Sequence, residues 1–330
     1  MHMFKRLSAL IIICFFFVSI LHAQTLEYSL KYDGIADNRE YFSPHHDAET
    51  IFGSRLGFAL GTSIDSIHQF RAGLSYFYEF GGSFGELPPH LIMYYSVDHH
   101  KWAFKIGAFP RKENIPYPNA LISEKYEYYN PIVDGLWVKH KSKNGNFGLF
   151  ADWVSRQDSN RREQFIAGFF GNLRYGNFTF EDYFYLFHKA GRIFKVEGEH
   201  IEDSMGAIFL LGYDFSDKVP LDILSVKTGT MSSAFRNRGD GSDFDINTSS
   251  YSEVVVDYKG FGLEAFLKFG SPHHFEFGSN YYNSATNYVR TRFYFTPINL
   301  ERIQGRFMYS LHFTAERMDH QQQFLLSYMF

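Results

Sequence analysis

The chain ends on Gln321–Phe330, QQQFLLSYMF, and the side chains of this stretch separate by parity into two faces. Successive side chains of a β-strand point to opposite faces, so the stretch predicts a strand with one aromatic and apolar face. An unprotected terminal strand of this kind promotes aggregation in a soluble protein. It therefore predicts a strand that pairs with the first strand of the chain, closes a barrel and turns its apolar face to lipid. The alternative is the last strand of a soluble β-sandwich. The residues of the apolar face are Phe324, Leu326, Tyr328 and Phe330.

The composition favours the barrel. Aromatic residues make up 19% of the 330 residues, yet the mean hydropathy is only -0.26. Many aromatic residues without net hydrophobicity are typical of strands that alternate between lipid and a water-filled lumen. Beyond Ala23 the sequence has no run of eighteen apolar residues, so it predicts no transmembrane helix. It also has no convincing amphipathic helical stripe.

The first residues read as a targeting segment. Lys5 and Arg6 precede the apolar run Leu7–Leu21, and Leu21-His22-Ala23 is a cleavage site of the expected kind. We therefore expect a secretory signal peptide at residues 1–23 and a single barrel at residues 24–330. Cleavage would remove the one cysteine, which excludes disulfides and thiol catalysis. It would also change the formal charge from -4 to -6, which excludes a generally basic nucleic-acid binder.

Segments with period-two alternation follow one another along the whole mature chain. Short turn signals such as Asn144-Gly145, Gly176-Asn177 and Lys259-Gly260 alternate with long connections such as Asp33–Glu49 and Pro110–Asp134. The sequence thus predicts an all-β fold: a closed transmembrane antiparallel up-and-down barrel of about 16 strands (range about 14–18), each of roughly nine to eleven residues. Short turns are expected at one end and long loops at the other. With the termini in the periplasm, the long loops would be extracellular.

Charged residues concentrate on the parity opposite to the aromatic one, and we expect them to line the lumen. Facing lipid they would cost about 2–4 kcal/mol each at mid-depth. Cations outnumber acids by eight to three in this set, which predicts a pore field that favours anionic or polar solutes. The alternative is a set of charges paired with each other inside the barrel. The predicted lumen residues are Arg55, Arg71, Glu79, Lys105, Asp152, Arg156, Glu264, Lys268, Arg290, Arg292 and Arg306.

Several of these candidates have a more specific expected role. Arg71, Arg290, Arg292 and Arg306 would form a cationic wall, and the connection Pro110–Asp134 would fold inward and narrow the pore. The aromatic residues of the predicted outer loops would either stack on sugar rings at the mouth or form loop and interface packing. These aromatic residues are Phe84, Tyr117, Tyr126, Tyr128 and Tyr129.

Two constellations could carry chemistry. His45-His46-Asp47 and His273-His274 have side chains that suit zinc or copper, but they lie in separate loops without a fixed spacing. Ser310 and His312 share the lumen face of one strand, which is the beginning of a hydrolytic pair, but the sequence positions no acid beside them. The sequence therefore predicts no metal, no cofactor and no catalytic residue, and a protein that is not an enzyme.

The signal segment, the alternation and the terminal Phe330 together resemble outer-membrane β-barrel proteins of Gram-negative bacteria. The stretches Arg39-Glu40-Tyr41-Phe42 and Thr50-Ile51-Phe52-Gly53, and the charged run from Asp152 to Glu163, are similar to uncharacterised barrels of the Bacteroidetes type. The resemblance covers nearly all of residues 24–330. It implies the fold and an outer-membrane location, but it offers no catalytic motif to transfer.

The resulting functional prediction is a porin-like outer-membrane channel for passive diffusion of small polar solutes, anionic ones included. One alternative is a surface binding or assembly barrel with a blocked lumen. Another is a hydrolase embedded in the barrel, which would need Ser310 and His312 within hydrogen-bond reach of each other and of an acid. The expected partners are outer-membrane lipid and small polar solutes but no nucleic acid, with the oligomeric state left open.

Overall fold

The structure is a computed structural model that describes residues 24–194, 196–241 and 243–330. The predicted signal peptide lies outside the described residues and stays a prediction. The described residues form 16 strands, two short α-helices and one 3-10 helix. No helix among them is long and apolar enough to cross a membrane. The strands are β1 (Gln24–Glu40), β2 (Glu49–Ile64), β3 (His68–Glu79), β4 (His90–His99), β5 (Trp102–Pro110), β6 (Ile132–Ser142), β7 (Gly145–Ser155), β8 (Gln164–Tyr175), β9 (Phe178–Lys189), β10 (Glu202–Asp214), β11 (Ile223–Asn237), β12 (Asp245–Tyr258), β13 (Phe261–Gly270), β14 (Asn287–Asn299), β15 (Ile303–Phe313) and β16 (Met318–Met329). The helices are α2 (Glu124–Tyr129), α3 (Asn280–Ser284) and the 3-10 helix η2 (Ser216–Lys218).

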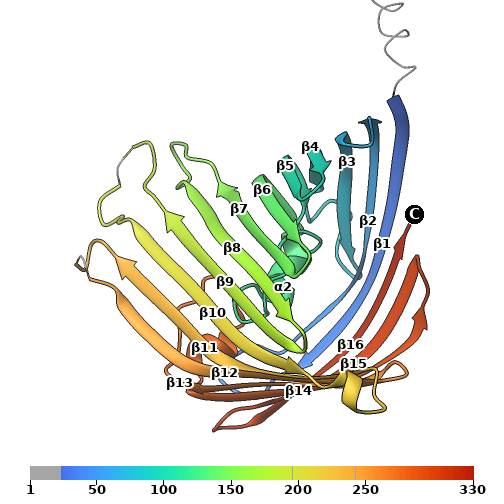
Figure 1. Ribbon diagram of the computed structural model, residues 1–330. Coiled ribbons are helices and arrows are strands. Elements are labelled where there is room, and N and C mark those ends of the chain that lie inside the picture. The colour runs from blue at the N-terminus through green and yellow to red at the C-terminus, as the bar shows by residue number, and fades with distance from the viewer. Residues whose placement is uncertain (1–23, 195, 242) are drawn as a thin grey trace, which may run out of the picture.

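The strands form one closed antiparallel barrel in which each strand pairs with its sequence neighbours and β1 pairs with β16. The backbones of Leu30 and Phe330 exchange two hydrogen bonds of 2.9 and 2.8 Å, so the last residue of the chain takes part in the closure. The start of β1 and the carboxyl terminus lie at the same end of the barrel, which we call the terminal end (Figure 1). The opposite end is called the loop end. The predicted fold class and strand number are confirmed.

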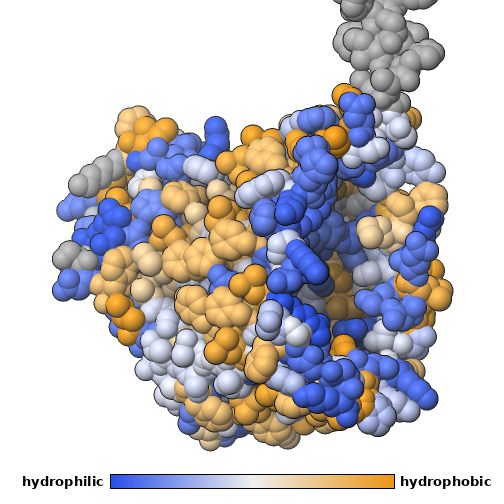
Figure 2. Space-filling view, viewed as in Figure 1, coloured by the Kyte–Doolittle hydropathy of each residue, from blue (hydrophilic) through white to orange (hydrophobic). Residues whose placement is uncertain are grey.

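The parity of the side chains is also as predicted. Phe70, Leu74 and Trp102 are 46%, 53% and 58% exposed on the outer surface. Figure 2 shows a largely hydrophobic outer wall beside a hollow with hydrophilic edges at the terminal end. In an outer-membrane barrel the apolar outer face contacts lipid, whereas the inner face can remain polar.

Two details differ from the predictions. β1 runs for 17 residues and continues to Glu40, so the predicted connection Asp33–Glu49 begins too early. Its charged residues Asp33, Asp37 and Arg39 face inward, and inward charges resemble a loop in sequence because they interrupt the apolar pattern. In addition, the connections do not separate strictly by length, since 215–222 at the terminal end is longer than 314–317 at the loop end.

Two of the loop-end connections fold into the lumen. We call them L3 (111–131, with α2) and L7 (271–286, with α3). Figure 1 shows α2 inside the ring of strands. Residues of both loops pack with inward aromatic side chains of β6–β9 on one side and of β12 and β14 on the other, in one buried cluster that crosses the lumen. Inward folding of Pro110–Asp134 is therefore what the structure shows. Members of the cluster include Leu121, Tyr117, Phe275, Tyr281, Trp137, Phe170, Tyr185, Tyr251 and Tyr288.

Candidate functional site

Four of the predicted lumen residues bond to L3. They lie on inward faces of β2, β3, β5 and β7, so they reach the loop from one half of the barrel wall. A buried charge requires a partner that compensates for lost hydration, and L3 provides these partners. The contacts are Arg55 to the carbonyl of Tyr128, Glu79 to the hydroxyl of Tyr129 (3.0 Å), Lys105 to Asn114 (2.7 Å) and Asp152 to Arg111 (2.6 Å).

The other half of the wall holds L3 through Glu124, the first residue of α2. Nη2 of Arg292 lies 2.6 Å from Oε1 of Glu124, and Nη1 of Arg290 lies 3.8 Å from it. Nε2 of Gln323 donates to Oε2 of the same carboxylate at 3.0 Å. Burial alone would raise the pKa of Glu124, but Arg292 and then Arg290 more than offset this effect and hold the pKa below its ordinary value. We call this cluster the Glu124 latch.

The remaining predicted lumen residues have separate surroundings. Arg71 pairs with Glu27 at 2.6 Å. Arg156 is not in the lumen, because it follows the end of β7 and its side chain is 75% exposed; that prediction is wrong. The four arginines of the predicted cationic wall do not act together. Arg290 and Arg292 belong to the Glu124 latch, whereas Arg71 and Arg306 have other partners. The other contacts are Glu264 to Arg292 (3.8 Å), Lys268 to the carbonyls of Ala285 and Gly270, and Arg306 to Thr296 (3.1 Å).

Ser310 and His312 do not form a hydrolytic pair. Both are buried on the inner face of β15. Oγ of Ser310 accepts a hydrogen bond from Arg292 at 3.0 Å. The His312 ring contacts the hydroxyl of Tyr288 at 2.7 Å and Oε1 of Gln321 at 3.2 Å. Both side chains therefore belong to the polar packing of the lumen.

The histidine doublets have protein partners. His273 lies between the hydroxyls of Ser233 (3.0 Å) and Ser249 (2.7 Å), and His274 faces Asp245 at 3.3 Å. Within the described residues, no three side chains of the His, Cys, Asp and Glu types come together in a way that could hold a metal ion.

His45 connects a serine to a carboxylate at the loop end. It belongs to the connection 41–48 between β1 and β2, called L1. Its Nδ1 lies 2.7 Å from Oγ of Ser284, the last residue of α3, and its Nε2 lies 3.0 Å from Oε2 of Glu316. Glu316 belongs to 314–317, the connection between β15 and β16, called L8. Hydrogen bonds from His45 and then Thr314 hold the pKa of Glu316 below its ordinary value. The three side chains have the order nucleophile, base and orienting acid that acyl transfer requires.

Ser284, His45 and Glu316, which we call the relay, differ in their exposure to solvent. The His45 side chain is 6% exposed, whereas Glu316 is 51% exposed and Ser284 is also open to the surface. The Ser284 hydroxyl lies 2.6 Å from the carbonyl oxygen of Asn280 as well, so its proton has two acceptors. The imidazole is thus held in place while the hydroxyl remains accessible to a substrate.

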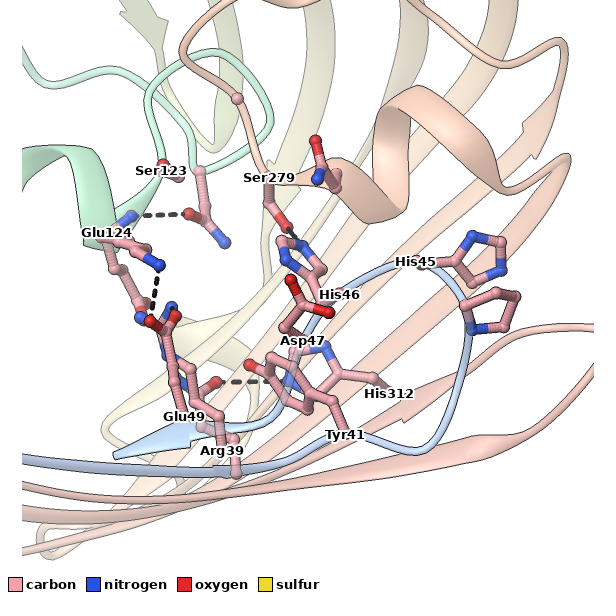
Figure 3. A pocket seen from close by; sticks show the side chains of 16 residues that line it. Arg39, Tyr41, His45, His46, Asp47, Glu49, Ser123, Glu124, Ser279 and His312 are labelled. Atoms are coloured by element: carbon pink, nitrogen blue, oxygen red, sulfur yellow. Dashed lines mark hydrogen bonds and ion pairs between the residues drawn. The ribbon is translucent and has the colours of Figure 1, made fainter. Parts of the chain in front are cut away.

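The neighbouring His46 faces the other way, into a pocket of about 390 Å³ between L1, L3 and L7. Figure 3 shows His46 turned toward Ser279, with His45 on the far side of L1. Nε2 of His46 lies 3.1 Å from Oγ of Ser279. Burial and then Arg39 lower the pKa of His46 to about 4, so the ring is neutral at pH 7. Lys125 and Glu49 also line this pocket.

Asp319 of β16 positions both L1 and α3. Its carboxylate accepts hydrogen bonds from the Ser43 hydroxyl, from the backbone N–H groups of Phe42 (2.6 Å) and Ser43 (2.9 Å), and from the Tyr281 hydroxyl (2.5 Å). Hydrogen bonds to an ionised acceptor are the stronger kind. One residue of the wall therefore positions the histidines of L1 relative to Ser279, the N-cap of α3, and Ser284, its last residue.

Sequence reasoning singled out His45 and His46 only as metal ligands and did not find Ser279, Ser284 or Glu316. The partners of the histidines lie more than two hundred residues away along the chain and meet them only because β14–β16 close against β1. The aromatic residues of L3 were expected at the mouth or the interface. Tyr117 and Tyr128 are instead buried within the lumen.

Solved structures with the same fold are outer-membrane barrels. A loop-deletion mutant of OmpT, an outer membrane protein of Vibrio cholerae, covers 93% of this chain and 100% of its own, with a TM-score of 0.56 at 10% identity. The anion-selective porin from Comamonas acidovorans covers 93% of this chain and 100% of its own, with a TM-score of 0.56 at 9% identity. OmpF of Salmonella typhi covers 93% of this chain and 98% of its own, with a TM-score of 0.53 at 11% identity. At these identities the similarity concerns the fold, which is a porin-like barrel of the outer membrane.

No curated protein matches the sequence. One family model does match it, over residues 19–329, and that family is described as lipid A 3'-O-deacylase-type. This match overturns the prediction that the chain is not an enzyme, because the prediction depended on the absence of a recognisable motif. The chain belongs to the lipid A 3'-O-deacylase-type family and has the fold of an outer-membrane barrel of 16 antiparallel strands.

Proposed function

We propose that this barrel is an ester hydrolase of the outer membrane that removes an acyl chain from a glycolipid of the lipid A type. The observation that carries the proposal is the relay Ser284–His45–Glu316, with contacts of 2.7 and 3.0 Å. The family description supports the substrate class. The relay lies at the loop end, which we assign to the cell exterior, with both termini in the periplasm.

The chemistry follows from the order of the three groups. Glu316 accepts the Nε2–H of His45 and so leaves Nδ1 unprotonated and directed at Ser284. Nδ1 takes the hydroxyl proton as Oγ attacks the ester carbonyl carbon. The imidazolium then donates this proton to the departing sugar oxygen, and the C–O bond of the ester breaks. Water, deprotonated by the same ring, releases the fatty acid from Oγ. The net reaction consumes one ester and one water and yields one carboxylic acid and one alcohol.

The test uses purified protein in lipid vesicles that contain lipid A, with released fatty acid measured by mass spectrometry. Ser284→Ala should lower the rate by a factor of about 10³ or more, and Glu316→Gln by about 10² or more. Ser279→Ala is the matched control, because Ser279 also contacts a histidine of L1; it should retain the activity. Full activity of Ser284→Ala would refute the assignment, and so would loss of activity in Ser279→Ala alone.

We propose passage of small polar solutes as a second candidate function, supported by the hydrophilic hollow at the terminal end (Figure 2). The cluster that crosses the lumen opposes free diffusion, so conduction would require movement of L3. Single-channel recordings in planar bilayers should then show brief, small conductance steps that become longer when the Glu124 latch is broken. Absence of conductance in both proteins would contradict this function.

A further inference from the structure

A row of polar side chains crosses the outer surface of the barrel near the loop end. Thr50, Asn38, Gln322 and Tyr309 are direct neighbours on β2, β1, β16 and β15. Oγ1 of Thr50 donates to Oδ1 of Asn38 at 2.9 Å, and Nδ2 of Asn38 donates to Oε1 of Gln322 at 2.6 Å. All four belong to the outward parity, which is largely apolar elsewhere on these strands. We call them the polar row.

Two ionisable side chains lie on the loop-end side of the row. Glu40 accepts a hydrogen bond from Nδ2 of Asn38 at 3.1 Å, and Nδ1 of His320 contacts the hydroxyl of Tyr309 at 2.7 Å. Within the described part of the chain, Nε2 of Gln322 and Nε2 of His320 have no hydrogen-bond partner. The outer wall thus presents free polar atoms at the loop-end edge of its apolar surface.

An apolar groove of about 610 Å³ continues from the polar row toward the terminal end. In the next outward row, Ala36 lies between Phe52 on β2 and Phe324 on β16, and Phe307 follows on β15. The rings of Phe307 and Phe324 stack at 4.5 Å. Because a methyl group stands between two phenyl groups, the surface is hollow at Ala36. The next outward residue of β1, Gly34, is also small.

The groove runs beside the strands that lead into the proposed catalytic relay. L1 follows β1 directly and carries His45, whereas L8 joins β15 to β16 and carries Glu316. L7 ends at β14, two residues after Ser284. A lipid whose chain lies in the groove would have its headgroup at the polar row, with the three groups of the relay on the loops above it.

We propose that this groove is a specific lipid-binding site, which holds one acyl chain of an outer-membrane glycolipid while the polar row binds the carbonyl and hydroxyl groups at the head of that chain. A second copy of the barrel is the competing occupant. A concave channel beside free hydrogen-bonding groups suits a chain with a polar end better than it suits a flat protein wall. The site deepens the proposed hydrolase by placing its substrate, but the binding itself follows from the wall alone.

The experiment fills the groove and measures bound lipid. Purified, delipidated protein in detergent is titrated with lipid A and examined by native mass spectrometry, in the Ser284→Ala background so that hydrolysis does not consume the ligand. Ala36→Phe should lower the occupancy at least tenfold. Ala72→Phe is the matched control, because Ala72 is also a small outward residue but lies on β3; it should bind as the parent does. Equal occupancy in both variants would overturn the proposal.

A second variant protects the test from a folding defect. Asn38→Leu combined with Gln322→Leu removes the two central residues of the polar row and makes the outer wall more apolar, so insertion into the membrane should not suffer. We expect at least tenfold weaker lipid A binding with unchanged far-UV circular dichroism. If Ala36→Phe instead dissociates a dimer of the protein and leaves lipid binding unchanged, a second copy of the barrel occupies the groove and the lipid proposal is wrong. If the parent protein releases fatty acid but neither variant changes lipid A binding, only the groove proposal is refuted and the proposed hydrolase activity stands.

Discussion

Replacing Glu124 by Gln should release L3 from the wall of the barrel. Glu124 accepts from Arg292 at 2.6 Å and lies 3.8 Å from Arg290. A glutamine keeps the shape of the side chain but leaves Arg290 without its counter-charge and Arg292 with only the more distant Glu264, at 3.8 Å. Both arginines are buried, at 8% and 3% exposed, so water cannot easily replace the lost carboxylate.

The expected magnitude follows from this burial. Loss of one partner from a buried ion pair costs about 3–5 kcal/mol, and the remaining amide oxygen recovers part of this. We expect about 2 kcal/mol, which is roughly a thirtyfold shift of the equilibrium between docked and undocked L3. The pKa of Glu124 is lowered by folding, so its contribution is complete above its ordinary value of 4.5 and is lost as the pH falls through the lower folded value. The variant should lack this acid-induced loss.

Hydrogen exchange measured by mass spectrometry provides the assay. Peptides from residues 111–131 should exchange about thirtyfold faster in Glu124→Gln at pH 7, while peptides from β8 to β12 should not change. Trp137 reports the same event, because its indole N–H donates to the carbonyl of Asn114 in L3 at 2.8 Å. Glu127→Gln is the matched control on the same helix, since Glu127 has no ion pair within the described residues. Equal protection of L3 in the wild type and Glu124→Gln would refute the latch.

Three further predictions concern the wall. Asp152→Asn should destabilise the barrel by about 3–5 kcal/mol in urea titrations, because it leaves Arg111 buried without a counter-charge; a change below about 1 kcal/mol would contradict this. Deletion of Phe330 removes its two backbone hydrogen bonds to Leu30 and should slow barrel assembly in a folding assay in detergent, with unchanged kinetics as the contrary result. Asp319→Asn should increase hydrogen exchange in L1 and lower fatty-acid release at least tenfold, because a neutral amide accepts hydrogen bonds more weakly than a carboxylate. The circular dichroism spectrum should be retained. Undiminished activity would show that Asp319 does not position the site.

Local alternation in the sequence was enough to predict the barrel, its strand number and its outward face. A strand in a membrane must satisfy its backbone through its neighbours, so parity translates directly into lipid-facing and lumen-facing surfaces. The terminal Phe330 indicated closure for the same reason. The charges of β1 were misread as a loop because inward polar residues and loop residues have similar composition.

The occupation of the lumen was decided by the tertiary structure. The sequence predicted that L3 folds inward, but not that Arg55, Glu79, Lys105 and Asp152 would each bond to it. A charge on an inward face is compatible with an open pore or with a docked loop, and the choice depends on contacts between residues far apart in the chain. The charged side chains that were expected to create a pore field therefore largely bond to L3 instead.

The sequence by itself determined that this protein is a closed barrel with an apolar exterior, since two-residue periodicity is a local property. Only the tertiary structure brought His45, Ser284 and Glu316 together, because these residues come from three loops that become neighbours when the last strands close against the first. Their spacing along the chain contains no period that could reveal the contact. The candidate chemistry is thus a consequence of barrel closure.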